Sequence, residues 1–250
     1  MNGERYLIVN ADDFGLSPGV NRGIIECHEN GIVTSASLMV RWPAAAEAAE
    51  YARARPRLGV GLHIDLGEWA YRNEEWTCLY EVVPTGDPAA VAEHVVRQVD
   101  AFRRLMGRDP THLDSHQHVH REEPARSAVL KAAAKIGIPV RHFSSGIHYC
   151  GEFYGQDGKG KTCPGAVTTA ALLQALAELP IGATEMACHP GYAEDLDTMY
   201  RFERADEVAA LCDSRVRAAV EAAGIILSTF ATVRGKWSAT VAIEADPVYR

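Results

Sequence analysis

The sequence lacks three features that would place it in a membrane or outside the cell. No apolar run is long enough to form a transmembrane helix. The N-terminus has no charged segment followed by an apolar one, so we expect no signal peptide. The six cysteines are scattered without a CxxC pair. Without an export signal, we interpret them as reduced thiols of a cytoplasmic protein.

The chain also has no excess of basic residues. Lysine and arginine number 25 against 33 acidic residues, which leaves a net charge of −8. A protein that binds nucleic acid or an anionic membrane needs a basic face. We therefore expect no nucleic-acid partner, whereas a neutral substrate remains compatible with this charge.

Several catalytic signatures are missing as well. The DFG at Asp13–Gly15 stands near the N-terminus, without the Gly-rich loop, VAIK or HRD elements of protein kinases. Gly15, Gly19 and Gly23 follow a predicted strand, but their spacing is not GxGxxG. There is no GxSxG, and no cysteine stands in a recognisable nucleophile setting. The sequence gives little support to a kinase, a dinucleotide-binding enzyme or a serine hydrolase.

What the sequence does contain is an alternation of short apolar runs with Ala-rich segments of helical periodicity. This alternation is typical of a parallel sheet with crossover helices. About seven mostly parallel strands wrapped by helices favour a (β/α) barrel, with an open doubly wound sheet as the alternative. No repeat or linker divides the chain, so we expect one catalytic domain over residues 1–250. The predicted strands are Tyr6–Asn10, Thr34–Val40, Leu58–Leu66, Thr111–Ser115, Pro139–Phe143, Thr184–Cys188 and Ile225–Phe230. The predicted helices lie near 19–30, 43–55, 88–107, 122–136, 168–179 and 205–223.

Two long polar stretches, 67–87 and 144–165, interrupt this pattern. Both are rich in glycine, aromatic and polar residues. Connections of this length are usually functional, so we expect active-site loops there.

Polar residues gather where the predicted strands end. The first strand ends at Asp12 and Asp13, the third carries His63, and the sixth ends next to His189. The carboxyl ends of parallel strands meet on one face, where sites form. Because adjacent buried carboxylates repel each other, a cation held between the acids and the histidines would compensate them.

The run THLDSHQHVH is the most specific of these signals. In an extended segment, Asp114, His116, His118 and His120 would lie on one side. Imidazoles concentrated in this way are typical of metal ligands or acid–base groups. Extended geometry need not persist through His120, and a polar loop remains the alternative. An isolated Asp-Asp pair can also be a helix cap, and a single histidine in an apolar strand is more often part of the core.

Taken together, these motifs resemble those of the YdjC-like carbohydrate deacetylase family. The matching stretches are NADDFGLSPGVNRGI, GIVTSASLMV, VGLHIDL, PTHLDSHQHVH and ACHPGY, spread in order over residues 10–192. The resemblance implies a distorted (β/α) barrel, one divalent metal ion and hydrolysis of an N-acetyl group on a sugar. The implied partner is an N-acetylated carbohydrate, and a homodimer stays open as an assembly.

The resemblance also implies roles for particular residues. Asp13, His63 and His116 would be the metal ligands. Asp12 would be the catalytic base, and His189 would lie in the active site as a candidate acid. We further place His118, Trp69 and Tyr154 among the predicted substrate-binding residues, since aromatic faces suit the apolar sides of sugar rings.

The chemistry of an acetamide supports this assignment. A metal held by one carboxylate and two imidazoles keeps positions for water and for the carbonyl oxygen, while a second carboxylate takes the proton. The mixed ligand set fits Zn²⁺, and Mg²⁺, which prefers more oxygen, is the other candidate.

Two further classes remain open. A phosphate-ester hydrolase would want more cations than Arg41 and Arg141 supply. A non-catalytic metal-binding protein would not need the second acid.

Overall fold

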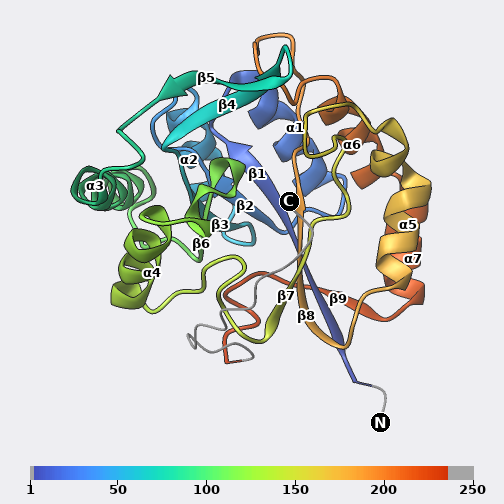
Figure 1. Ribbon diagram of the computed structural model, residues 1–250. Coiled ribbons are helices and arrows are strands. Elements are labelled where there is room, and N and C mark those ends of the chain that lie inside the picture. The colour runs from blue at the N-terminus through green and yellow to red at the C-terminus, as the bar shows by residue number, and fades with distance from the viewer. Residues whose placement is uncertain (1–2, 236–250) are drawn as a thin grey trace.

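The computed structural model describes residues 3–235, and its centre is a parallel sheet of seven strands curled into a half-barrel (Figure 1). Six strands follow one another in the order β6-β3-β2-β1-β8-β7, and β9 pairs with the first residues of β1. All these pairings are parallel, which confirms the prediction of a barrel-like parallel sheet. The strands are β1 (Arg5–Phe14), β2 (Ser35–Leu38), β3 (Gly59–Ile64), β6 (Leu113–Ser115), β7 (Ile147–Cys150), β8 (Gly182–Cys188) and β9 (Ile225–Leu227).

The central strand β1 carries the two adjacent acids near its carboxyl end. It pairs with β8 along residues 5–11, and its apolar side chains are buried. Its pairing with β2 loses the regular register between Ala11 and Phe14, and Asp13 has a φ of 67°. An irregularity of this kind redirects the side chains at the end of a strand. Asp12 and Asp13 can therefore leave β1 in different directions.

Helices surround the sheet on its outer side (Figure 1). The third helix begins as predicted, because Asp87 accepts hydrogen bonds from the first helical turn, and it ends at Gly107 with a φ of 69°. Its apolar positions Val91, Val95 and Phe102 are buried. The helices are α1 (Pro18–Glu29), α2 (Ala45–Arg53), α3 (Pro88–Met106), α4 (Ala125–Ile136), α5 (Thr169–Ala177), α6 (Glu203–Leu211) and α7 (Ser214–Ala222), with 3₁₀ turns at η1 (His116–Arg121) and η2 (Pro164–Val167).

Two predicted elements are wrong. Pro139–Phe143 is not a strand: only Val140 makes a bridge, to Leu113, and His142 adopts a φ of 67° that ends any extended conformation. The neighbour of β8 is instead β7, inside the stretch expected to be a loop. The predicted helix over 205–223 is two helices, because Asp213 interrupts the first and caps α7 by accepting from the N–H of Arg215.

The other predicted loop, 67–87, is largely a two-stranded antiparallel hairpin of β4 (Gly67–Arg72) and β5 (Glu75–Glu81). In Figure 1 the hairpin crosses the end of the sheet toward which β1 points. Its turn consists of Asn73 and Glu74, both with positive φ. Asp65, directly after β3, accepts a hydrogen bond from the hydroxyl of Tyr80 at 3.1 Å. The end of the third strand thus anchors the hairpin.

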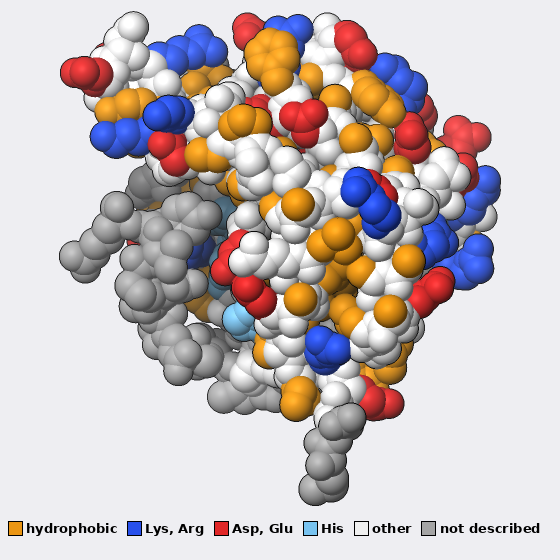
Figure 2. Space-filling view, turned by 90° about the vertical axis from the view of Figure 1, so that its right-hand side faces the viewer, with side chains coloured by type: hydrophobic (Ala, Val, Ile, Leu, Met, Phe, Trp, Pro, Cys, Tyr) orange, Lys and Arg blue, Asp and Glu red, His pale blue; other side chains and the backbone are white. Residues whose placement is uncertain are grey.

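Among residues 3–235, no helix combines the length and the apolar character needed to cross a bilayer. On the face shown in Figure 2, lysine and arginine side chains are scattered among acidic and apolar ones and form no continuous basic area.

Candidate active site

The two adjacent acids face different sets of partners. Asp13 Oδ1 lies 3.2 Å from Nδ1 of His116 and 3.5 Å from Nε2 of His63. Asp12 instead turns toward Arg141 and His189. Both carboxylates are buried, with 2% of Asp12 and 1% of Asp13 exposed. The structure thus brings together all five residues that the sequence nominates for metal binding and acid–base chemistry.

The second oxygen of Asp13 is occupied by an arginine from a distant part of the chain. Arg204, on α6, donates to Asp13 Oδ2 at 2.6 Å and also to the carbonyl of His189 at 3.2 Å. Burial raises the pKa of Asp13, but the Arg204 charge and the neighbouring histidines outweigh burial and hold the pKa well below its usual value. Asp13 is therefore ionised, with Oδ1 directed at the two histidines.

His63 is oriented by a carboxylate on the next strand. His63 and Asp114 are register partners in the β3–β6 pairing, and His63 Nδ1 lies 2.8 Å from Asp114 Oδ1. A proton on Nδ1 that is donated to Asp114 leaves Nε2 with a lone pair, and Nε2 faces Asp13. This is the usual arrangement of a metal-binding histidine with a carboxylate behind it.

The strand that leads to His116 ends earlier than an extended DxHxHxH run requires. β6 stops at Ser115, and η1 follows with left-handed conformations at Gln117 and His118. His116 turns to Asp13, whereas His120 turns to the Ser115 hydroxyl at 2.5 Å. Asp114 and the three histidines therefore do not share one side, because the extended geometry that this would require ends at Ser115.

His116 lies between two carboxylates. Besides Asp13, it faces Glu68 of the hairpin, whose Oε2 is 3.7 Å from His116 Nε2. Burial lowers the pKa of His116, but the two carboxylates outweigh burial and raise the pKa to about 10.

Asp13, His63 and His116 have the donors and the spacing of a metal site. One donor atom from each lies within 4.8 Å of the others. Two ligand atoms at zinc distances and a tetrahedral angle would be about 3.4 Å apart. The Asp13 Oδ1 contacts of 3.2 and 3.5 Å match this spacing.

A second group of donors, Asp12, His63 and Asp114, is also close enough to hold an ion. Both of its carboxylates already bind the Arg141 guanidinium, at 2.6 and 2.8 Å. The first group therefore fits a metal ion better.

Arg141 is the centre of a buried ionic cluster behind Asp12. Its side chain is fully buried and contacts Asp12, Asp114 and, at 2.6 Å, Glu185. Asn10 donates to Asp12 Oδ1 at 2.8 Å. Asp12 is thus held in one orientation by three side-chain hydrogen bonds.

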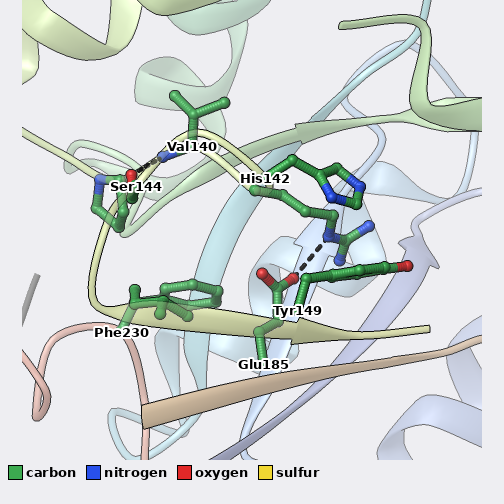
Figure 3. A pocket seen from close by; sticks show the side chains of 9 residues that line it. Val140, His142, Ser144, Tyr149, Glu185 and Phe230 are labelled. Atoms are coloured by element: carbon green, nitrogen blue, oxygen red, sulfur yellow. Dashed lines mark hydrogen bonds and ion pairs between the residues drawn. The ribbon is translucent and has the colours of Figure 1, made fainter. Parts of the chain in front are cut away.

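A small cavity lies next to this cluster. Glu185 points into it with the Tyr149 ring alongside (Figure 3). Val140, His142, Ser144 and Phe230 are among the residues that line it, whereas none of the candidate metal ligands does. The cavity belongs to the packing behind Arg141 rather than to the candidate metal site.

His189 follows β8 and lies on the other side of Asp12, with Nε2 3.7 Å from Asp12 Oδ2. Its backbone N–H donates to Glu207, which fixes the main chain at this point. Burial is the main cause that lowers the pKa of the His189 ring, to about 4. At neutral pH the ring is uncharged, and within the described part of the chain its buried Nδ1 has no hydrogen-bond partner.

The predicted substrate-binding residues lie around this centre in different settings. Tyr154 stacks on Tyr200 at 4.7 Å and meets the His189 ring edge-on at 5.3 Å. The backbone of Trp69 exchanges two hydrogen bonds with the Gln117 side chain, which ties the hairpin to η1. His118 packs against His142 and Tyr149. Their role in substrate binding stays a prediction.

The sequence does not indicate the roles of three residues near the candidate site. It suggests Arg141 only as a phosphate ligand, and it gives no signal for Arg204 or Glu68. Arg204 occupies a helix that has no recognisable motif, and Glu68 lies in a stretch expected to be a loop. The only available signal was that two adjacent buried acids require cationic partners, which points to an arginine but not to Glu68.

The residues from Tyr6 to Ala222 match the model of the YdjC-like protein family. The chain belongs to the YdjC-like family. This YdjC-like protein is 31% identical to a chitooligosaccharide deacetylase of Salmonella schwarzengrund, over 88% of this chain and 96% of the relative. It is 33% identical to a chitooligosaccharide deacetylase of Klebsiella pneumoniae, over 92% of this chain and all of the relative.

Solved structures with the same fold include a protein of Enterococcus faecalis V583 described as a candidate cellobiose-phosphate cleavage protein. It has a TM-score of 0.70 and 27% identity and covers 92% of this YdjC-like protein and 99% of its own chain. A family 4 carbohydrate esterase of Streptomyces lividans has a TM-score of 0.52 at 16% identity, with 91% and 93% of the two chains covered. At that identity the likeness concerns the fold alone.

Proposed function

We propose that this chain is a metal-dependent hydrolase that removes an N-acetyl group from an N-acetylated carbohydrate. The observation that carries the proposal is the division of the adjacent acids, with Asp13 facing two histidines and Asp12 facing a third, His189. The names of the Salmonella and Klebsiella relatives support the same chemistry.

The metal would be held by Asp13, His63 and His116. When bound there, a divalent ion supplies Lewis acidity, because it lowers the pKa of a water molecule and polarises the acetamide carbonyl. The remaining contribution comes from side chains that hold and move protons. Zn²⁺ or Mg²⁺ would suit the site, with one carboxylate and two imidazoles favouring Zn²⁺.

Asp12 would be the general base. Arg141 and Asn10 fix its carboxylate in place, so little reorganisation is needed when it accepts a proton from water. A general base in this position contributes about 10²–10⁴-fold to the rate.

His189 would deliver a proton to the departing amine. Because its pKa of about 4 keeps the resting ring neutral, it must first receive a proton. Asp12, 3.7 Å away, is the neighbouring group that acquires one during the reaction. Asp12 and His189 would then act in turn, with the proton from water ending on the amine.

The phosphate-ester alternative is less well supported. A phosphate substrate needs free cationic side chains, and both arginines considered for that role are paired with carboxylates. Arg41 contacts Asp65 at 2.6 Å, and Arg141 is enclosed in its buried ionic cluster. The described site therefore suits a neutral acetamide better than a phosphate ester.

Acetate release from a panel of N-acetylated sugars tests the proposed function. The panel should include N-acetylglucosamine, chitooligosaccharides of increasing length and a phosphorylated disaccharide, with phosphate and acetate measured in parallel. Acetate without phosphate supports the proposal. Release of phosphate alone would contradict it.

We predict that Tyr154 affects the choice between sugars more than it affects stability. In a Tyr154→Leu variant, the loss of an aromatic contact worth about 0.5–1.5 kcal/mol should change the ratio of kcat/KM between two sugars by about 2- to 12-fold. Trp69→Leu should have a similar effect. Tyr51→Leu, on the outer helix α2, is the control and should alter the melting temperature without altering the ratio. Equal losses for all sugars in the Tyr154 variant would indicate a packing role only.

A further inference from the structure

Glu68 is a buried acid that the proposed reaction does not use. It belongs to the hairpin strand β4 and is 7% exposed. Its Oε1 accepts a hydrogen bond from the hydroxyl of Thr198 at 2.6 Å, and its Oε2 lies 3.7 Å from His116 Nε2. A buried carboxylate is costly without such partners, so its position requires an explanation.

The ring of His116 explains the position of Glu68. Its Nδ1 faces Asp13, which leaves Nε2 as the nitrogen that carries a proton when the ring is a metal ligand. Nε2 is buried and makes no hydrogen bond within residues 3–235. Glu68 Oε2 is the acceptor placed on that side of the ring, and a shift of less than 1 Å would form the bond.

The arrangement repeats the one at His63, where Asp114 stands behind Nδ1 at 2.8 Å. Both candidate ligand histidines thus have a carboxylate on the nitrogen that points away from Asp13. For His63 the carboxylate comes from the neighbouring strand of the sheet. For His116 it comes from the hairpin that covers the end of the sheet.

We propose that Glu68 is a positioning residue for His116, and that it links the hairpin and the Thr198 segment to the metal ligand. The inference rests on the proposed function, since it assumes that His116 binds the metal. Carboxylates behind ligand histidines fix the ring orientation and raise its basicity, and their loss typically costs 10- to 100-fold in metal affinity, roughly.

Two other roles for Glu68 fit the geometry less well. It is absent from both groups of donors that lie close enough to hold an ion, so it is not placed as a ligand. Its Oε1 accepts from Thr198 and its Oε2 faces Nε2 of His116, the nitrogen that points away from Asp13, so neither oxygen is directed at the proposed metal position.

The test is the affinity of the full-length protein for Zn²⁺, measured by competition with a chromophoric chelator. The Glu68→Gln and Glu68→Ala variants should bind Zn²⁺ about 10- to 100-fold more weakly than the wild type. Glu75→Gln, an exposed glutamate on the same hairpin, is the matched control and should bind like the wild type. The visible spectrum of the Co²⁺-loaded protein should change in the Glu68 variants and not in the control.

Unchanged Zn²⁺ affinity in folded Glu68 variants would overturn the inference, and so would a fall in turnover alone. If neither variant folds, Thr198→Val carries the test, because it removes the other partner of Glu68. An unaltered Zn²⁺ affinity in that variant would also overturn the inference. Failure of the wild type to bind any divalent ion would contradict the proposed metal-dependent function itself. If the wild type binds the ion and the variants bind it equally well, only the proposed role of Glu68 is contradicted.

Discussion

Replacing Asp12 with asparagine should leave the fold and the metal in place and reduce deacetylation by about two to four orders of magnitude. Asparagine has the size of aspartate and can still accept a hydrogen bond from Arg141. It cannot accept the proton that the attacking water must lose. Turnover and metal content should be measured on the same preparation, since the expected result is a loss of turnover without a loss of metal.

Asp13→Asn provides the contrast, because the two residues are neighbours of the same type. Asp13 faces His63 and His116, so its loss should weaken metal affinity, and activity should partly return at high metal concentration. The assignment of roles would be contradicted if Asp12→Asn retained near-normal turnover. It would also be contradicted if Asp12→Asn lost its metal while Asp13→Asn kept it.

Replacing Arg141 with methionine should destabilise the protein by about 3–5 kcal/mol, because the variant keeps buried carboxylates without their cation. Arg141 contacts Asp12, Asp114 and Glu185 within 2.8 Å, and all four side chains are buried. The free energy of unfolding, measured with urea, checks this value. Arg126→Met, which removes only a surface pair with Glu123, should change it by less than about 1 kcal/mol.

The deficit of the Arg141→Met variant should depend on pH. Burial already raises the pKa of Glu185 to about 7, although Arg141 opposes the shift. Without Arg141, the folded-state pKa of Glu185 should rise further above its unfolded value. A carboxyl group with a raised folded-state pKa stabilises the folded protein while it is protonated. This stabilisation is lost as the pH rises through the folded-state pKa. The deficit should therefore be smaller near pH 5 than near pH 8, and a deficit that grew on acidification would contradict this account.

The sequence predicted a mostly parallel, barrel-like sheet and the meeting of Asp12, Asp13, His63, His116 and His189. Such predictions succeed because the residues stand at the ends of parallel strands, whose common face follows from the topology. The helix starting at Asp87 was equally predictable, since its cap, its apolar spacing and its terminal glycine agree.

The parts that could not be predicted depend on contacts between distant segments. Arg204 reaches Asp13 across 191 positions in the chain, and no local pattern signals that pairing. His142 adopts a left-handed conformation that sequence periodicity does not indicate, and the expected strand that contains it does not form. The irregular pairing of β1 with β2 at Asp13 is likewise not signalled by the sequence, although the alternation of side chains along a strand already predicts that Asp12 and Asp13 diverge.

The central claim is that a divalent ion at Asp13, His63 and His116 supports deacetylation. Acetate release by the wild-type protein should be measured before chelation, after removal of metal, and after addition of Zn²⁺ or Mg²⁺, with His63→Ala and His116→Ala in parallel. We expect activity to disappear with the chelator, to return with the metal in the wild type and to stay absent in both variants. Acetate release that continues undiminished in the metal-free protein would contradict the account.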